Sequence, residues 1–472
     1  MSNRIADLTK EAVNKKVEHA AEIVLSRQAF IQQFSDIEDF VLRGPEVDAK
    51  AAAATEYNLR IIRSGLAGIL WKNDVFIGID VIDHILFGLI SSGKTINIVP
   101  EFLKSIQHKG LHRTGFIVYP LHSFGVLGLG FYRFFKKSLP YMTIGNAGLS
   151  ITAQTNSKER TFAFLDHVRE VFAIKQKIPA DSIEHFISSR PLRWIENNPL
   201  LAQRVRSFTG TYYENQFIYM LKLRMSTALL MMLSVMESRR TMDERLIHGS
   251  SAQVNNRQTL DIKHYLTFET PVGRRKSLTA SCIPMMAGQL ELALLSDLNV
   301  AVDPRVWSKP GAIKRLSSLQ QTVTTVEKGY LNEVILVGGD SVRSRVHRKL
   351  IMSIDSYRRS FSAGVRDSEA IVSLAIAFET LLTDHYAPKV TERIIRRVRL
   401  CLKGIKGTRR FQRVVSQLFA CRGAIVHQGS ARMFSDLRIA QKVYVLCLQH
   451  VVSSLPRLPR QSGSPIANIL GD

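Results

Sequence analysis

The chain has 472 residues, 45% of them hydrophobic and 22% charged, and its 64 Lys and Arg residues outnumber its 40 Asp and Glu residues. This composition is typical of a globular protein, and the length exceeds that of one ordinary core, so two or three domains are expected. The formal charge of +24 indicates an anionic partner, nucleic acid before membrane. A surface that only keeps the protein soluble is the alternative explanation.

The excess positive charge is uneven along the chain. Residues 341–472 contain 23 basic and 8 acidic residues, which places a net charge of +15 in the last 132 residues. The preceding 340 residues carry only the remaining +9. We therefore expect a binding site for a polyanion in the C-terminal part of the chain.

The cysteines and the N-terminus indicate a compartment. The four cysteines show neither a CxxC pair nor Cys/His ligand spacing, so neither a disulfide framework nor a metal site is expected. The N-terminus lacks the apolar core of a signal peptide, and the uncharged run 115–132 is interrupted by glycines and a proline. The prediction is a cytoplasmic protein that binds no membrane and needs no cofactor.

The first 330 residues show structural patterns but no recognisable chemistry. Apolar residues at helical spacing predict helices over residues 1 to about 70, and short β-prone runs follow from about 74 to 150. The segment Gln216–Arg239 contains a stretch that is apolar on all sides, as in a buried helix. Residues 1–330 are therefore predicted to form a region of unknown fold, helical at its start and mixed α/β afterwards.

The C-terminal part is predicted to be helical. Leu331–Asp340 is interpreted as a strand and turn that lead into a helical domain over residues 341–456, followed by a flexible tail over residues 457–472. Within the helix that begins near Asp367, Glu379 lies close to the apolar face. A bare carboxylate is costly there, so this side chain is expected to pair with a cation.

A strongly basic run follows this helix. Between Lys389 and Arg413 lie ten basic residues and one acidic residue. Solvated faces usually carry both signs, so one sign alone favours contact with the phosphates of a nucleic acid. An ordinary solvated surface is the alternative, whereas a lipid surface is disfavoured by the lack of a large aromatic amphipathic face. The predicted RNA-binding residues are Arg393, Arg396, Arg397, Lys403, Lys406, Arg409, Arg410 and Arg413.

Two candidate catalytic residues come next. Arg422 and His427 are five residues apart, shortly before Gly429. On a regular helix, a separation of five residues leaves two side chains about 140° apart. The two groups could therefore share a site only if the helix distorts near Gly423, or if two copies of the chain meet.

Residues 343–455 resemble the Apea-like branch of the HEPN domains. The resemblance is carried by the capped helix that contains Ala377-Phe-Glu-Thr-Leu-Leu, the Glu392-Arg393 helix, and the Arg422-x4-His427 motif before Gly429. It implies an α-helical bundle that dimerises and, in active members, a metal-independent ribonuclease in which two Arg/His motifs face one cleft. Many such members are toxins or antiviral effectors that cut RNA. Members commonly have a polar residue directly after the Arg, where this chain has Gly423.

These observations predict a mostly α-helical protein with a mixed α/β N-terminal region and a C-terminal HEPN-like bundle. The predicted function is that of a dimeric, metal-independent endoribonuclease. His427 would move the proton of the reaction, Arg422 would stabilise the charged phosphorus intermediate and Glu379 would support the site. The N-terminal region would recognise a trigger or a regulatory partner. The alternative is an inactive RNA-binding or dimerisation module, in which Arg422 is only the ion-pair partner of Glu379 and His427 is a capping residue.

Overall fold

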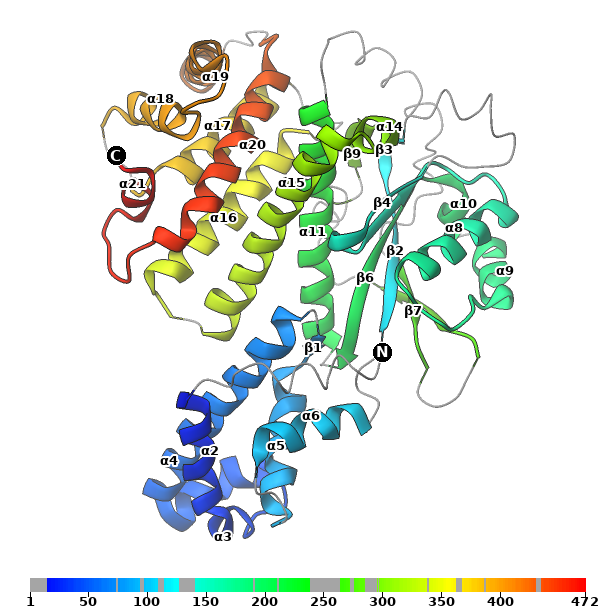
Figure 1. Cartoon of the computed structure of the whole chain (residues 1–472), viewed down its shortest axis with the longest axis vertical. Helices are drawn as coiled ribbons and strands as arrows, with labels where there is room; N and C mark the ends of the chain where they lie inside the picture. Colours follow the sequence, from blue (N-terminus) through cyan, green and yellow to red (C-terminus); the bar gives the residue numbers. More distant parts are fainter. Residues whose placement is uncertain are drawn as a thin grey trace.

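A computed structural model gives the arrangement of the chain (Figure 1). The structure describes residues 15–73, 75–93, 97–108, 114–126, 141–189, 192–209, 212–237, 264–271, 276–284, 295, 297–337, 339–361, 367–385, 388–429 and 434–472.

An N-terminal helical lobe projects from the rest of the molecule (Figure 1). Helix α2 packs along α4, and α5 packs against both α4 and α6. Four phenylalanines form T-shaped or tilted ring pairs within this lobe, which gives it an apolar centre of its own. Its helices are α2 (Lys15–Ser26), α3 (Gln28–Ile31), α4 (Ile37–Lys72), α5 (Ile79–Ser91) and α6 (Ile98–His108).

The middle of the molecule is a seven-stranded, largely antiparallel sheet. The strand order is β4-β5-β6-β2-β7-β8, and β1 pairs with β6 in parallel. A separate parallel pair is formed by β3 and β9. The strands are β1 (Val75–Ile77), β2 (Thr114–Pro120), β3 (His122–Val126), β4 (Tyr141–Ile144), β5 (Leu149–Thr152), β6 (Leu200–Thr209), β7 (His264–Glu269), β8 (Thr279–Pro284) and β9 (Asp297–Val302).

Helices cover both faces of this sheet, which explains why β2 is buried along its whole length. Successive side chains of a strand point to opposite faces. Phe116 and Val118 accordingly join the apolar cluster beneath α8 (Lys158–Val171), α9 (Ala180–Ser188) and α10 (Trp194–Asn197). Ile117 and Tyr119 join the cluster on the opposite face, where α11 lies (Figure 1).

Helix α11 (Tyr212–Glu237) is the central helix of the fold. It contacts β6 and β9 on one side and α15, α16 and α20 on the other. Its segment Phe217–Met236 is the one described helix long and apolar enough to span a membrane, but 89% of it is buried inside the protein. This burial identifies a core helix and is consistent with a soluble protein.

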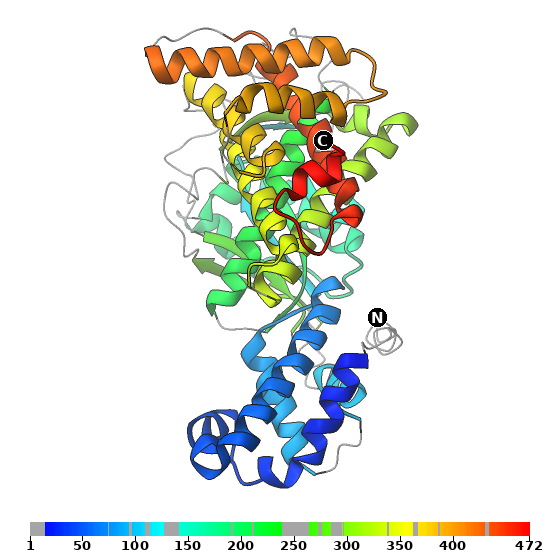
Figure 2. The same ribbon diagram turned by 90° about the vertical axis from the view of Figure 1, so that its left-hand side faces the viewer.

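The C-terminal part is a helical bundle beside α11. Figure 2 shows α19 running along one edge of the molecule. The remaining elements are η1 (Gly145–Ala147), α14 (Pro304–Trp307), α15 (Pro310–Gly329), the π-helical turn η4 (Tyr330–Leu336), α16 (Val342–Arg359), α17 (Asp367–Leu382), α18 (Val390–Cys401), α19 (Thr408–Gln428), α20 (Leu437–Ser454), η5 (Leu455–Arg457) and α21 (Pro465–Leu470).

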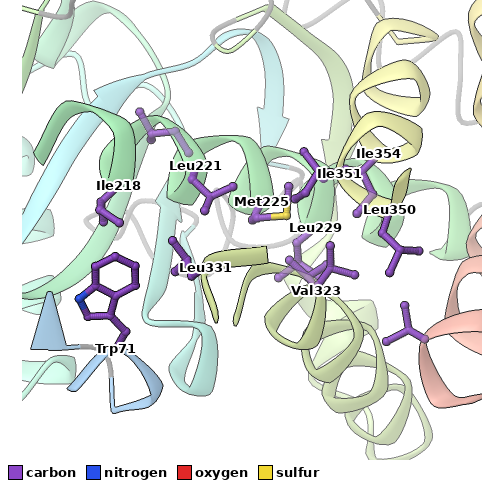
Figure 3. Close-up of a cluster of buried hydrophobic side chains, with 14 of the residues drawn as sticks. Trp71, Ile218, Leu221, Met225, Leu229, Val323, Leu331, Leu350, Ile351 and Ile354 are labelled. Carbon is purple, nitrogen blue, oxygen red and sulfur yellow. The ribbon is translucent and has the colours of Figure 1, made fainter. Parts of the chain in front are cut away.

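One apolar core joins the lobe, α11 and the bundle. Figure 3 shows Trp71 of α4, Met225 of α11, Leu331 of η4 and Leu350 of α16 among the side chains of this core. The predicted fold class, mostly α with a mixed α/β region, is confirmed. The predicted division between residues 330 and 341 remains a prediction, and the buried cluster runs across it.

The predicted strand at Leu331–Asp340 is wrong. Residues 330–336 continue α15 as a π-helical turn, in which Leu331 is buried while Ile335 is 36% exposed. A short apolar run does not distinguish a strand from a helix by periodicity. Helix-type backbone continues here through Val337, and Gly339 adopts a φ of +75°.

The predicted flexible tail is also wrong. Residues 457–472 end in α21, whose Ile466, Ile469 and Leu470 are buried. The carboxylate of Asp384 accepts hydrogen bonds from the backbone N–H groups of Ile466 at 2.6 Å and Ala467 at 3.2 Å. These contacts hold the first turn of α21 against the bundle.

Candidate nucleic-acid interface

Helices α18 and α19 form a hairpin with a basic turn. Gly404 and Gly407 in this turn have φ values of +84° and +87°, which a residue with a side chain rarely adopts. The hydroxyl of Thr408 donates to the carbonyl oxygens of Leu402 at 3.0 Å and Ile405 at 2.6 Å, and so fixes the start of α19. The turn thereby presents Lys403 and Lys406 on the surface.

Helix α19 has one buried and one exposed face. Its buried residues are Val414, Val415, Leu418, Phe419 and Ala424. At about 100° per residue, six exposed residues fall within an arc of about 100°, which also contains the buried Ala424. We call this surface the α19 face; it consists of Arg409, Arg413, Ser416, Gln417, Ala420 and His427, all exposed.

His427 belongs to the α19 face. It lies 18 residues after Arg409, which is five helical turns at 3.6 residues per turn, so the two side chains leave the helix in the same direction. Among the described residues, His427 forms no hydrogen bond or ion pair, and the end of the helix is closed by Gly429 at a φ of +62°. The imidazole is therefore open to solvent beside a basic helix.

Arg422 lies on the other side of α19. Its Nη2 is 3.8 Å from Oε1 of Glu379 on α17, and the two side chains are 31% and 27% exposed. The distance is that of an ion pair without a hydrogen bond. The Nε of Arg422 is buried and has no hydrogen-bond partner in the described part of the chain. The expected cation for Glu379 is thus Arg422, and the guanidinium still has an unsatisfied donor.

The structure does not bring Arg422 and His427 together within one chain. Helix α19 is continuous from Thr408 to Gln428, so the distortion near Gly423 that would unite them is absent from it. A Cβ atom built on Gly423 would meet no atom within 4 Å. The surface between the two motif residues is therefore open.

Arg397, predicted to bind RNA, does not face solvent. Its side chain is 5% exposed, and its guanidinium donates to the carboxylates of Asp384 at 3.1 Å and Asp472 at 2.7 Å and to the carbonyl oxygen of Leu382 at 2.7 Å. The prediction for Arg397 is wrong because its position on α18 points into the contact with α21. Its charge is neutralised within the fold.

Arg396 and Arg393 are intermediate cases. Arg396 binds the carboxylate of Asp472 at 2.6 Å but remains 63% exposed. Arg393 is partly buried, and its Nη2 donates to the carbonyl oxygen of Pro388 at 3.5 Å. Arg396 is therefore partly committed to the fold, whereas Arg393 has no acidic partner among the described residues.

The remaining predicted RNA-binding residues are exposed, and none of them forms an ion pair with an acidic side chain in the described part of the chain. Helix α19 contains no acidic residue at all. The basic surface is thus smaller than the sequence predicted and lies on the turn and the first half of α19. It consists of Lys403, Lys406, Arg409, Arg410 and Arg413.

The sequence prediction missed two features of this region. Asp384 and Asp472, which neutralise Arg397, are 88 residues apart, and no local pattern connects them. The α19 face could have been predicted from the sequence, because the 18-residue separation of Arg409 and His427 is a whole number of helical turns.

Among the described residues, no group of three or more His, Cys, Asp or Glu side chains could hold a metal ion.

A scan of known protein families, a search of curated proteins and a search of solved structures found no match to this chain.

Proposed function

We propose that the protein is a metal-independent endoribonuclease of the HEPN type, in which the α19 face holds the RNA. The observation that carries the proposal is that His427, the candidate proton-transfer group, shares this exposed, acid-free face with Arg409 and Arg413. A phosphate backbone held by the two arginines would lead toward the imidazole. Exposed cations without acidic partners are available to phosphates, whereas neutralised ones are not.

The proposed reaction is an internal transesterification. His427 removes the proton from a ribose 2′-OH, and the 2′-oxygen attacks the adjacent phosphorus. The new P–O2′ bond forms as the P–O5′ bond breaks, and the leaving 5′-oxygen takes up a proton. The products end in a 2′,3′-cyclic phosphate and a 5′-hydroxyl. Only RNA carries the required hydroxyl.

Arg422 would act in a second copy of the chain. It lies about 140° around the helix from His427 of the same chain, so one copy presents the two groups in different directions. The partial exposure of the Arg422 side chain, 31%, and the open surface at Gly423 support a site completed by a homodimer. There the guanidinium of one copy would stabilise the charge that develops on the phosphate beside His427 of the other. Glu379 would position that guanidinium.

The experiment is cleavage of end-labelled RNA by the full-length protein in EDTA. We expect 2′,3′-cyclic phosphate ends with the wild type and a loss of at least about 100-fold in rate with His427→Ala and with Arg422→Ala. Mixing the two inactive variants supplies a test of the composite site, because a mixed dimer keeps one intact His427/Arg422 pair and should regain activity. Cleavage that survives His427→Ala would refute the proposal.

A second function is favoured by the Arg422–Glu379 pair. If this ion pair is only structural, the protein is an RNA-binding or dimerisation module without activity. That function predicts RNA binding without cleavage under any condition. It also predicts that Arg422→Ala lowers stability and leaves RNA binding unchanged.

The remaining parts of the proposal concern cellular context. A ribonuclease of this kind would act in the cytoplasm as a toxin or antiviral defence effector. The N-terminal lobe and sheet would recognise the trigger or a regulatory partner. Growth after induction of the wild type and of His427→Ala in the same host tests this role, because a toxic nuclease requires a difference between the two cultures.

A further inference from the structure

The geometry points to a sequence-independent track for single-stranded nucleic acid on the α19 face, which binds DNA as well as RNA and leads to His427. This inference deepens the proposed function and relies on it only for cleavage. It concerns what the face recognises, how long the bound strand must be, and what would compete with the substrate.

The chemistry of the face indicates recognition of the backbone alone. Its charged groups are arginines, and between Arg413 and His427 it presents Ser416, Gln417 and Ala420. Ala424 in the same arc is buried, so the open path to His427 runs on the side of Gly423, where an added Cβ would meet no atom within 4 Å. Both aromatic residues of α19, Phe411 and Phe419, lie outside the face. Stacking platforms for bases are therefore lacking on it, and stacking is what most single-strand binders add to charge. His427 acts on the 2′-OH only in cleavage, and the anchoring groups are cations that contact phosphates, which DNA and RNA share, so DNA should bind as RNA does.

The start of the helix supplies the anchor. Arg409 and Arg410 lie in the first turn of α19, beside Lys403 and Lys406 of the preceding turn. The N-cap residue, Gly407, offers no side chain to the free N–H groups of this turn. Cations placed at the positive end of a helix dipole are unfavourable for the helix itself, and a bound phosphate would relieve the repulsion.

The length of the track sets the length of the strand. Eighteen residues separate Arg409 from His427 and fourteen separate Arg413 from His427. At about 1.5 Å per residue, these separations are about 27 Å and 21 Å. A strand stacked at about 3.4 Å per nucleotide covers them with about six to eight nucleotides. Shorter strands reach the imidazole without reaching the anchor.

Fluorescence anisotropy in EDTA with labelled oligothymidylates and oligouridylates of 4, 8 and 12 nucleotides tests the inference. Binding of the oligouridylates is measured with the full-length His427→Ala protein, so that the RNA is not cleaved during the measurement. We expect the 12-mers of DNA and RNA to bind within about threefold of each other, and the 4-mers to bind at least tenfold more weakly. The double variant Arg409→Ala/Arg413→Ala should weaken binding of both 12-mers at least tenfold. It should also reduce the slope of the logarithm of the binding constant against the logarithm of the salt concentration by about 1.4, because two phosphate contacts are lost.

The matched control is Lys314→Ala/Arg315→Ala, which removes two exposed cations from α15 instead of α19. It should change the affinity less than twofold. Equal losses in the two double variants, or a 12-mer of DNA that does not bind, would overturn the track. In the wild type, the DNA 12-mer should also inhibit RNA cleavage competitively. Absence of cleavage with the binding pattern intact would refute the proposed function and leave the track standing.

Discussion

The basic run from Lys389 to Arg413 contributes to two regions that the fold treats in opposite ways. On α18, Arg397 is buried between Asp384 and Asp472 and serves to hold α21 in place. On α19, Arg409 and Arg413 are exposed and have no acidic partner among the described residues. The difference teaches that a cation in a basic sequence becomes available to a ligand only when the fold supplies no carboxylate for it. Substitutions on the two helices and at their partners should reveal this difference, most strongly at Arg397.

Replacement of Arg397 by Ala should destabilise the protein by about 3–5 kcal/mol, because the nearly buried Asp384 would lose its ion-pair partner and Asp472 would keep only Arg396. Arg413→Ala is the matched control, which should change the free energy of unfolding by less than about 0.5 kcal/mol. Urea denaturation followed by circular dichroism measures both. Equal losses of stability in the two variants would contradict the claim that Arg397 stabilises the fold whereas Arg413 is available to bind a ligand.

The buried His347 extends the comparison to pH. Burial lowers the pKa of His347 to about 4, with a smaller contribution from Arg343, and its Nδ1 has no hydrogen-bond partner among the described residues. Between about pH 6.5 and 4, His347 binds a proton in the unfolded state but not in the folded state. The free energy of unfolding therefore decreases as the pH falls through this range. The loss should approach about 3 kcal/mol at about 1.4 kcal/mol per pH unit.

His347→Gln should remove that part of the acid sensitivity. Denaturant midpoints of the wild type and this variant between pH 4 and 8 are the measurement. An acid sensitivity that persists in His347→Gln would assign it to other groups.

Asp472 provides the third comparison, because it binds both Arg397 and the more exposed Arg396. Burial raises the pKa of its carboxyl, but the hydrogen bonds from Arg396 and Arg397 outweigh that effect and lower the pKa below its usual value. The charged carboxylate therefore stabilises the fold above the usual carboxyl range and loses this effect as the pH falls through the lowered pKa. Asp472→Asn should cost about 1–3 kcal/mol at pH 7 and progressively less at acid pH.

The stability of Asp472→Asn relative to the wild type at pH 7 and pH 3 checks this prediction. Limited proteolysis at residues 457–464 gives a second readout, since release of α21 should expose the segment before it. A difference in stability that is the same at both pH values would show that the carboxylate acts through packing and not through its charge.

The sequence could supply the class of the fold and the location of the charge, because both follow from composition and period. It placed the buried helix at Gln216–Arg239, and α11 occupies that position. The sequence could not show which basic residues of the run are buried and which are exposed. The carboxylates that neutralise Arg397 come from the end of α17 and from beyond α21, far from it in the sequence. The strand expected at Leu331–Asp340 failed for a related reason: a short apolar run has no period of its own, and α15 extends into it.

The same limit applies to the candidate site. The spacing of Arg422 and His427 already indicated that a regular helix separates them, and α19 is continuous through Gly423. The pairing of Arg422 with Glu379 required the approach of α17 to α19, which no local pattern specifies. Helical spacing therefore places His427 beside the exposed cations, whereas a tertiary contact supplies Arg422 with its carboxylate.

The smallest expected effect is also the most specific, because it separates stability from binding at one residue. Arg409 lies in the first turn of α19, where a positive side chain opposes the helix dipole and no acidic residue compensates it. Arg409→Glu should therefore stabilise the protein by about 0.3–1 kcal/mol while it weakens the binding of RNA. Arg413→Glu, one turn further on, changes the charge equally but lies beyond the reach of the helix terminus.

Arg413→Glu should weaken RNA binding to a similar degree without the gain in stability. Thermal or urea denaturation and anisotropy with the uridylate 12-mer, performed on both variants, provide the two readouts. A substitution that stabilises the fold and weakens RNA binding would show that Arg409 lowers the stability of the helix and contributes to binding. A binding role for the α19 face requires this result. Loss of stability in Arg409→Glu would instead make this arginine part of the scaffold, like Arg397, and the contrast between the two helices would disappear.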